Sequence, residues 1–168
     1  SMKRNATIKA LDYVYWSSPV ANFASSAISP ATPTSVIWKW EPTTATAYAS
    51  QFGNWVNGVE TMSLGRGYIV RSPNGWSSTP SVFTANFVGV PNNGNITRPI
   101  TRSTYIGPNY TGPTSTQVTA NDDNWNLLGN PYPSAISADA FLTTNFTHIN
   151  PFLDLWKHGN APAAIASP

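Results

Sequence analysis

Two tryptophans in polar, turn-rich surroundings are the residues of this chain best suited to bind a ligand. Trp55 lies in the run FGNWVNG at 52–58, and Trp76 lies in PNGWSS at 73–78. A flat indole on a loop can stack on the apolar face of a sugar ring, while neighbouring amides bond its hydroxyls. We therefore predict that a glycan or another cell-surface ligand binds here. The amides predicted to assist are Asn54, Asn57 and Asn74.

The densest cluster of oxygen ligands is Asn121, Asp122 and Asp123. Calcium prefers such hard oxygens, and calcium ions often brace loops of extracellular β-modules. The spacing matches no EF-hand, and the alternative interpretation is an Asx-rich turn before a strand. The sequence predicts no other cofactor than this structural calcium.

Catalytic motifs are missing from the sequence. It has no Gly-x-Ser-x-Gly elbow, no His-Glu-x-x-His and no phosphate-binding glycine loop. His148 and His158, with no further histidine, make a poor transition-metal set. A carboxylate pair such as Glu41 and Glu60 keeps a polysaccharide-active enzyme open as an alternative. We predict no catalytic residue and expect that the chain is not an enzyme.

Composition excludes several classes of protein. The net charge is only +2, from nine Lys and Arg against seven Asp and Glu, and the basic residues are dispersed. Nucleic-acid binding is therefore not expected. The absence of cysteine excludes disulfides and thiolate chemistry, and no apolar run approaches the ~18 residues that span a membrane. Charged residues make up only 10% of the chain, which is typical of an all-β extracellular module rich in Thr, Ser, Asn and aromatics.

The pattern of apolar residues and turn signals predicts an all-β fold, a β-sandwich or jelly roll with one short helix. The helix is expected at 137–144, capped by Ser134 or Ser137 and with Asp139 in its first turn. A hairpin is expected between 81–90 and a return strand at 96–105. The stretches 21–35 and 43–51 are expected to be long surface loops. Further strands are predicted at 9–16, 36–40, 65–71, 125–128 and 152–156.

The other five tryptophans lie in strand-like runs and are expected in the core. They are Trp16, Trp38, Trp40, Trp125 and Trp156.

The expected domain organisation is simple. Ser1 and Met2 look like a remnant of tag removal, and residues 3–158 are expected to form one module or a fragment of a larger domain. Residues 159–168 are expected to be a linker or a truncated end. Neighbouring domains are expected to be covalently linked to it in a longer protein.

Three blocks of sequence carry a resemblance to a known group of proteins: DYVYWSSPV at 12–20, GRGYIV at 65–70 and WNLLGNPYPSAI at 125–136. Together with Phe141-Leu142 and Leu155-Trp156, they resemble the β-rich, adhesin-like modules of Bacteroidota secreted and cell-surface proteins. Those modules stand upstream of type IX secretion system sorting domains. The resemblance implies export across the outer membrane, a location outside the cell or on its surface, and a β-sandwich. It implies no catalytic residues.

The run GNPYP at 129–133 has an explanation in turn chemistry. Gly129 is expected to supply a positive φ, Asn130 is held extended by the following proline, and the Tyr132–Pro133 bond is of a type that tolerates cis. We expect a rigid corner between strand and helix. The alternative is that Asn130 and Tyr132 lie at the rim of a pocket.

Two classes of function follow from the sequence. The first is a non-catalytic recognition module that binds glycans or other surface partners. The second is a structural spacer that presents a neighbouring catalytic or sorting domain. A recognition module should place Trp55 or Trp76 in a concave exposed site, whereas a spacer should bury every Trp.

Overall fold

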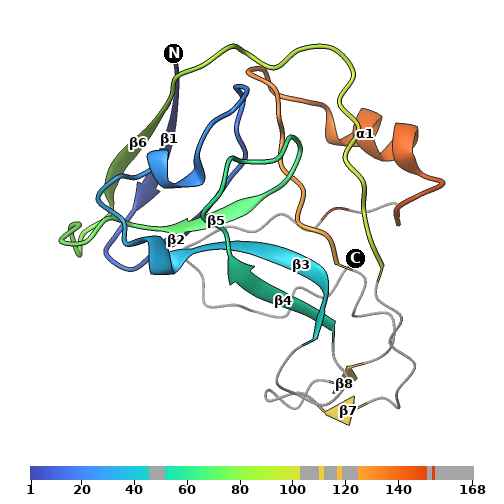
Figure 1. Ribbon diagram of the computed structural model, residues 1–168, viewed down its shortest axis with the longest axis horizontal. Coiled ribbons are helices and arrows are strands. Elements are labelled where there is room, and N and C mark those ends of the chain that lie inside the picture. Colours follow the sequence, from blue (N-terminus) through green and yellow to red (C-terminus); the bar gives the residue numbers. More distant parts are fainter. Residues whose placement is uncertain (46–51, 103–109, 112–116, 119–124, 151–152, 154–168) are drawn as a thin grey trace.

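In the part of the chain that the structure describes, the fold is all-β, with two main antiparallel sheets and one short α-helix (Figure 1). It was obtained as a computed structural model, which describes residues 1–45, 52–102, 110–111, 117–118, 125–150 and 153. A small pair of strands, β7 (Tyr110–Thr111) and β8 (Gln117–Val118), lies apart from the two sheets. Within the described ranges no helix has the length and apolar character needed to cross a membrane. The sandwich-like, all-β prediction is confirmed.

The larger sheet has four antiparallel strands in the order β2-β5-β3-β4. Because side chains alternate along a strand, it has two distinct faces. One face belongs to the core. The other, which we call the aromatic face, carries Tyr13, Tyr15, Trp38, Trp40 and Trp55. The strands are β2 (Tyr13–Trp16), β3 (Ile37–Ala45), β4 (Phe52–Asn57) and β5 (Tyr68–Arg71).

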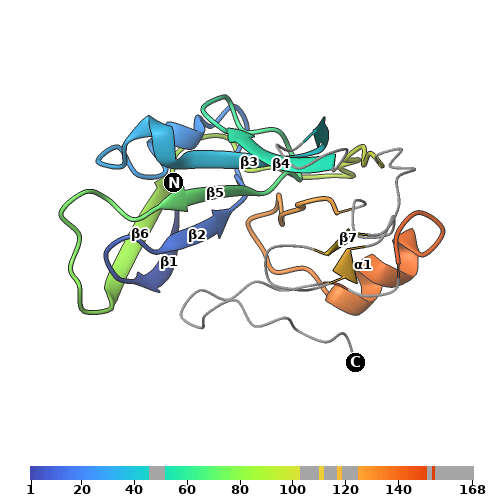
Figure 2. The same ribbon diagram turned by 90° about the horizontal axis from the view of Figure 1, so that it is seen from below.

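The smaller sheet pairs β1 (Met2–Ile8) with β6 (Ser81–Phe87) along their whole lengths. In Figure 2 these two strands run steeply across the direction of β2, β5 and β3. Their inward residues, Ile8, Ala85 and Phe87, are buried. The two sheets thus enclose one core, as in an orthogonally packed sandwich.

The segment between β2 and β3 also contributes to the core. It contains two 3₁₀ turns, η1 (Ser25–Ala27) and η2 (Thr34–Val36), and it buries Phe23 and Ile28. Ser25 is fully buried, and its hydroxyl donates to Gly58 O at 2.7 Å and accepts from Glu60 N at 3.1 Å. The stretch 21–35 is therefore a packed connection, not the surface loop expected from its Ser, Ala and Pro content.

The predicted hairpin is wrong. Strand β6 pairs with β1, and residues 96–102 form no strand. Pro99 in that stretch has no N–H to offer a partner strand. Met2, which looked like a remnant of tag removal, pairs with Phe87. A contact between strands so far apart in the chain cannot be read from local pattern.

The helix α1 (Ala138–Asn145) confirms the predicted one with a shift of one residue. Ser137 caps it, because its hydroxyl accepts a hydrogen bond from Ala140 N at 3.2 Å, and Asp139 lies in the first turn. Both features favour a helix start at this point. None of the helix residues is buried.

The GNPYP run is a corner that joins the three sequence blocks. Gly129 N donates to Gly65 O at 3.1 Å, and Gly67 N donates to Leu127 O at 3.0 Å. A Cβ on Gly129 would overlap the side chain of Ser17, so the block at 12–20 packs against the other two. The run does turn the chain ahead of helix α1, but the strand expected at 125–128 is only an isolated bridge between Leu128 and Arg66. Gly129 is needed for this close approach and not for a positive φ. The Tyr132–Pro133 bond is trans.

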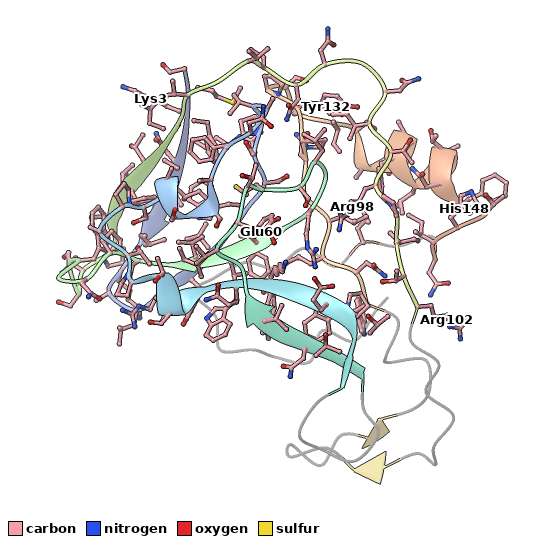
Figure 3. The ribbon with its side chains drawn as sticks, viewed as in Figure 1. Lys3, Glu60, Arg98, Arg102, Tyr132 and His148 are labelled. Atoms are coloured by element: carbon pink, nitrogen blue, oxygen red, sulfur yellow. The ribbon has the colours of Figure 1, made fainter. Side chains whose placement is uncertain are left out.

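Side chains fasten the corner to both sheets. Asn92 Nδ2 donates to Ser18 O at 3.1 Å and to Pro131 O at 2.9 Å, and Arg4 donates to Tyr132 O at 2.7 Å. The Tyr132 hydroxyl donates to Gly94 O at 2.8 Å, and Figure 3 labels Tyr132. Asn130 accepts from Tyr132 N at 2.9 Å. Asn130 and Tyr132 therefore serve the corner.

We predict that Asn92→Ala lowers the free energy of unfolding by about 1–3 kcal/mol, because two carbonyls lose their donor at once. Urea unfolding followed by tryptophan fluorescence measures it. The neighbouring exposed Asn93, whose side chain bonds only its own turn, gives the matched control Asn93→Ala, which should change the midpoint little. Equal midpoints for the two variants would show that Asn92 does not hold the corner.

Candidate functional site

An open pocket of about 180 Å³ lies where the aromatic face meets the segment after residue 124. Strand β3 contributes Trp40 and β4 contributes Trp55. The segment before the corner contributes the rest. The lining residues are Trp40, Trp55, Trp125, Asn126 and Leu127, and we call this the tryptophan pocket.

Strand pairing positions the first two rings. Trp40 and Trp55 are direct cross-strand partners, and their rings pack edge to face with centroids 5.3 Å apart and an interplanar angle of 72°. Tyr15 packs against the other side of Trp55, at 6.4 Å between centroids. Gly53 has φ +95°, and a Cβ there would overlap the Trp40 ring. A glycine is therefore required at 53 for the Trp40 ring to pack against β4.

Backbone and amide contacts position the third ring. The Trp40 Nε1 donates to Trp125 O at 2.9 Å. Asn126 holds the same segment to Thr101, donating from Nδ2 to Thr101 O at 2.9 Å and accepting at Oδ1 from Thr101 N at 3.2 Å. Leu127 packs over Gly67, because a Cβ on residue 67 would lie only 2.5 Å from Cγ of Leu127. The ring of Trp125 is left 51% exposed.

The tryptophan pocket offers flat apolar surface and hydrogen-bond donors. Within the described part of the chain, the indole N–H of Trp55 and that of Trp125 donate no hydrogen bond. Among the residues that the structure describes, no charged side chain lines the pocket. Indole faces stack on C–H groups, and the free N–H groups suit a ligand that carries oxygen acceptors. This chemistry fits a neutral, amphipathic ligand.

Only Trp55 of the five predicted binding residues belongs to this pocket. It lies in a strand, not a loop, and is half-buried. Asn54 alternates to the opposite face, where it pairs with Glu41. Asn57 is bonded within the chain, donating to Thr34 O at 3.2 Å and accepting from Val59 N at 3.0 Å.

The second predicted tryptophan has an internal role. Trp76 Nε1 donates to Ile8 O at 3.1 Å, and its ring packs on Phe83 at 5.6 Å between centroids. It thereby closes the end of the smaller sheet. Asn74 accepts from Arg71 at 2.7 Å. The proposed calcium ligands Asn121, Asp122 and Asp123 lie outside the described residues.

Sequence reasoning assigned Trp40 and Trp125 to the core, and both line the pocket instead. No local signal identified Trp40, because Val36, Trp38 and Trp40 share an apolar face and the charged Lys39 and Glu41 lie on the other face. Trp16 is buried as expected, Trp38 is half-exposed, and Trp156 lies outside the described residues.

A second cluster, the ion cluster, lies on the core side of β3. Lys39 Nζ lies 2.5 Å from Glu60 Oε2 and 3.8 Å from Glu41 Oε1. Arg66 pairs with Glu41 at 2.6 Å and also donates to Trp40 O at 2.6 Å. The Tyr68 hydroxyl donates to Glu60 Oε1 at 2.5 Å. Figure 3 shows Glu60 within the ribbon, above β3 in that view.

The ion cluster brings together the two carboxylates that the sequence suggested as a catalytic pair. Burial raises the pKa of Glu60, but hydrogen bonds from Lys39 and Tyr68 and the positive charges of Lys39 and Arg66 outweigh it, so the net pKa is lowered. Burial and the hydrogen bond to Glu60 raise the pKa of Tyr68. A general acid needs a raised carboxyl pKa. Both carboxylates are held by cations, an arrangement suited to stabilising the fold.

Metal binding finds no support among the residues that the structure describes. They include no group of three or more His, Asp or Glu side chains placed to hold an ion. The pocket lining contains only an amide and apolar rings or chains.

We predict that Glu60→Gln destabilises the protein by about 1–3 kcal/mol at neutral pH, because Lys39 loses its closest carboxylate. The lowered pKa of Glu60 means that its contribution is complete above the ordinary glutamate pKa and is lost as the pH falls through the folded value. The gap between wild type and variant should therefore shrink on acidification. Urea unfolding across acidic and neutral pH measures it, and a gap independent of pH would contradict the assignment.

No curated protein and no solved structure matches this chain. One family model matches it over residues 1–168. The chain belongs to that family, which is described as a domain of unknown function (DUF8693).

Proposed function

We propose that this chain is a non-catalytic extracellular module of a secreted or cell-surface bacterial protein, and that it recognises glycans through the tryptophan pocket. The observation that carries this proposal is the convergence of Trp40, Trp55 and Trp125 on one open pocket free of charged side chains. The extracellular, adhesin-like setting rests on the resemblance of the three sequence blocks to type IX secretion modules of Bacteroidota.

The chemistry of the pocket favours neutral glycans. A sugar ring presents C–H groups to an indole face and hydroxyl oxygens to indole N–H donors, and the pocket provides both kinds of contact. An anionic sugar would find no cation there, because Arg66 and Lys39 are paired with carboxylates on the other face of the sheet. A single open pocket implies weak binding, so useful affinity would come from several copies acting together.

A structural spacer remains the second candidate function. The internal contacts of Trp76 and Asn74 favour it, since one of the two loops expected to bind a ligand serves the fold alone. A polysaccharide-active enzyme fragment is the less favoured alternative, because Glu41 and Glu60 are both held in ion pairs.

We predict that Trp125→Ala weakens binding to a neutral glycan about two- to tenfold, because one stacking contact of ~0.5–1.5 kcal/mol is lost. A glycan array identifies the ligand, and calorimetry with that glycan measures the loss. Because the Trp125 side chain is 51% exposed, the variant should fold normally. Trp76→Ala is the matched control: it should lower the melting temperature and leave glycan affinity unchanged.

Two outcomes would contradict the proposal. Uniformly negative arrays for the wild-type protein would remove glycan recognition and favour the spacer. Binding that is lost with Trp76→Ala and kept with Trp125→Ala would place the site at the other tryptophan.

A further inference from the structure

We propose that Asn93 is a site of spontaneous covalent modification, at which its amide is converted to a carboxylate by the following residue. The chain has three Asn-Gly pairs, at 57–58, 74–75 and 93–94. Glycine makes such pairs reactive because it has no side chain to shield its backbone nitrogen from the preceding amide. The structure separates the pair at 57–58 from the other two, which both lie in exposed turns. This inference does not depend on the proposed function.

The chemistry needs no partner but water. The Gly94 nitrogen attacks Cγ of Asn93, so an N–C bond forms, the nitrogen gives its proton to water, and the bond from Cγ to Nδ2 breaks with release of ammonia. The product is a five-membered succinimide. Water then opens the ring at either carbonyl and leaves aspartate or isoaspartate. No electron is gained or lost.

The geometry at Asn93 favours this step. Gly94 N lies 2.8 Å from Asn93 Oδ1, so the amide carbon already lies beside the attacking nitrogen. Both residues are exposed, and a Cβ on Gly94 would meet nothing within 4 Å. The pair belongs to a turn, and none of the described strands includes it. Among the described residues, Gly94 N donates to no backbone carbonyl, in contrast to Gly58 N.

The other two pairs are restrained. Gly58 N donates to Ile37 O at 2.9 Å, so the attacking nitrogen is engaged beside the sheet. The Asn57 amide is held at both ends, by Thr34 O and Val59 N. Asn74 is held at one end only, where its Oδ1 accepts from Arg71 at 2.7 Å. We therefore expect the rates to follow the order Asn93, then Asn74, then Asn57.

The modification would affect the corner. Isoaspartate adds one carbon to the main chain between residues 93 and 94, which displaces the Gly94 carbonyl. That carbonyl accepts the hydrogen bond of the Tyr132 hydroxyl at 2.8 Å. Each event also replaces a neutral amide by a carboxylate, so the net charge falls from +2 to +1. Loss of the Tyr132 contact should lower the melting temperature of the isoaspartate form by about 2–4 °C.

The test is incubation of the folded protein in mildly alkaline buffer, with ion exchange to separate acidic forms and peptide mass spectrometry to locate the change. We expect Asn93 to react first and Asn57 at least about tenfold more slowly, because Asn57 must await local opening of the sheet. Asn93→Gln should remove the first acidic form, whereas Asn74→Gln should leave it. The same incubation in concentrated urea should abolish the difference between the three pairs.

Equal rates at Asn93 and Asn57 in the folded protein would overturn the proposal. An order that persists unchanged in urea would also overturn it, because the selectivity would then come from the local sequence and not from the fold.

Discussion

The alternation of side chains along β3 is the constraint on which the rest of the structure depends. This strand pairs with β5 on one side and β4 on the other, so its register is fixed twice. Ile37 enters the core and Lys39 and Glu41 join the ion cluster on the same side, while Trp38 and Trp40 are turned to the aromatic face. A slip of one residue would exchange these sets and place two indoles among the ions. Burial of Ile37 and pairing of Lys39 with Glu60 both oppose that slip.

The corner positions the part of the tryptophan pocket that does not come from the sheet. The run at 129–133 packs on Ser17, bonds to Gly65 and is held by Arg4 and Asn92. These contacts hold the segment at 125–128 beside the larger sheet. There the backbone oxygen of Trp125 accepts a hydrogen bond from the Trp40 indole N–H. The tryptophan pocket is thus formed between a sheet and a segment distant in sequence. The corner provides the rigidity, and the exposed ring of Trp125 provides the contact surface.

The features predicted from the sequence are those that interactions between residues close in the chain determine. The helix cap at Ser137, the strands around Trp38 and Val70 and the shared face of Trp38 and Trp40 follow from capping, period and turn chemistry. What it missed depends on contacts between distant residues. The pairing of β1 with β6 and the assignment of FGNWVN to a strand needed tertiary structure, because Gly and Asn there favour a turn locally. Trp55 was expected on a loop and lies in a strand, whereas Trp125, which lines the same pocket, was assigned to the core.

The most direct test of the tryptophan pocket is a titration of ¹⁵N-labelled protein with a neutral oligosaccharide, followed through the indole N–H signals in nuclear magnetic resonance spectra. Glycan recognition at this pocket predicts that the Trp55 and Trp125 signals shift together along one saturable curve, while the Trp76 signal, bonded to Ile8, stays in place. Shifts confined to Trp76, or none in any indole signal for neutral sugars bound by the protein, would contradict it.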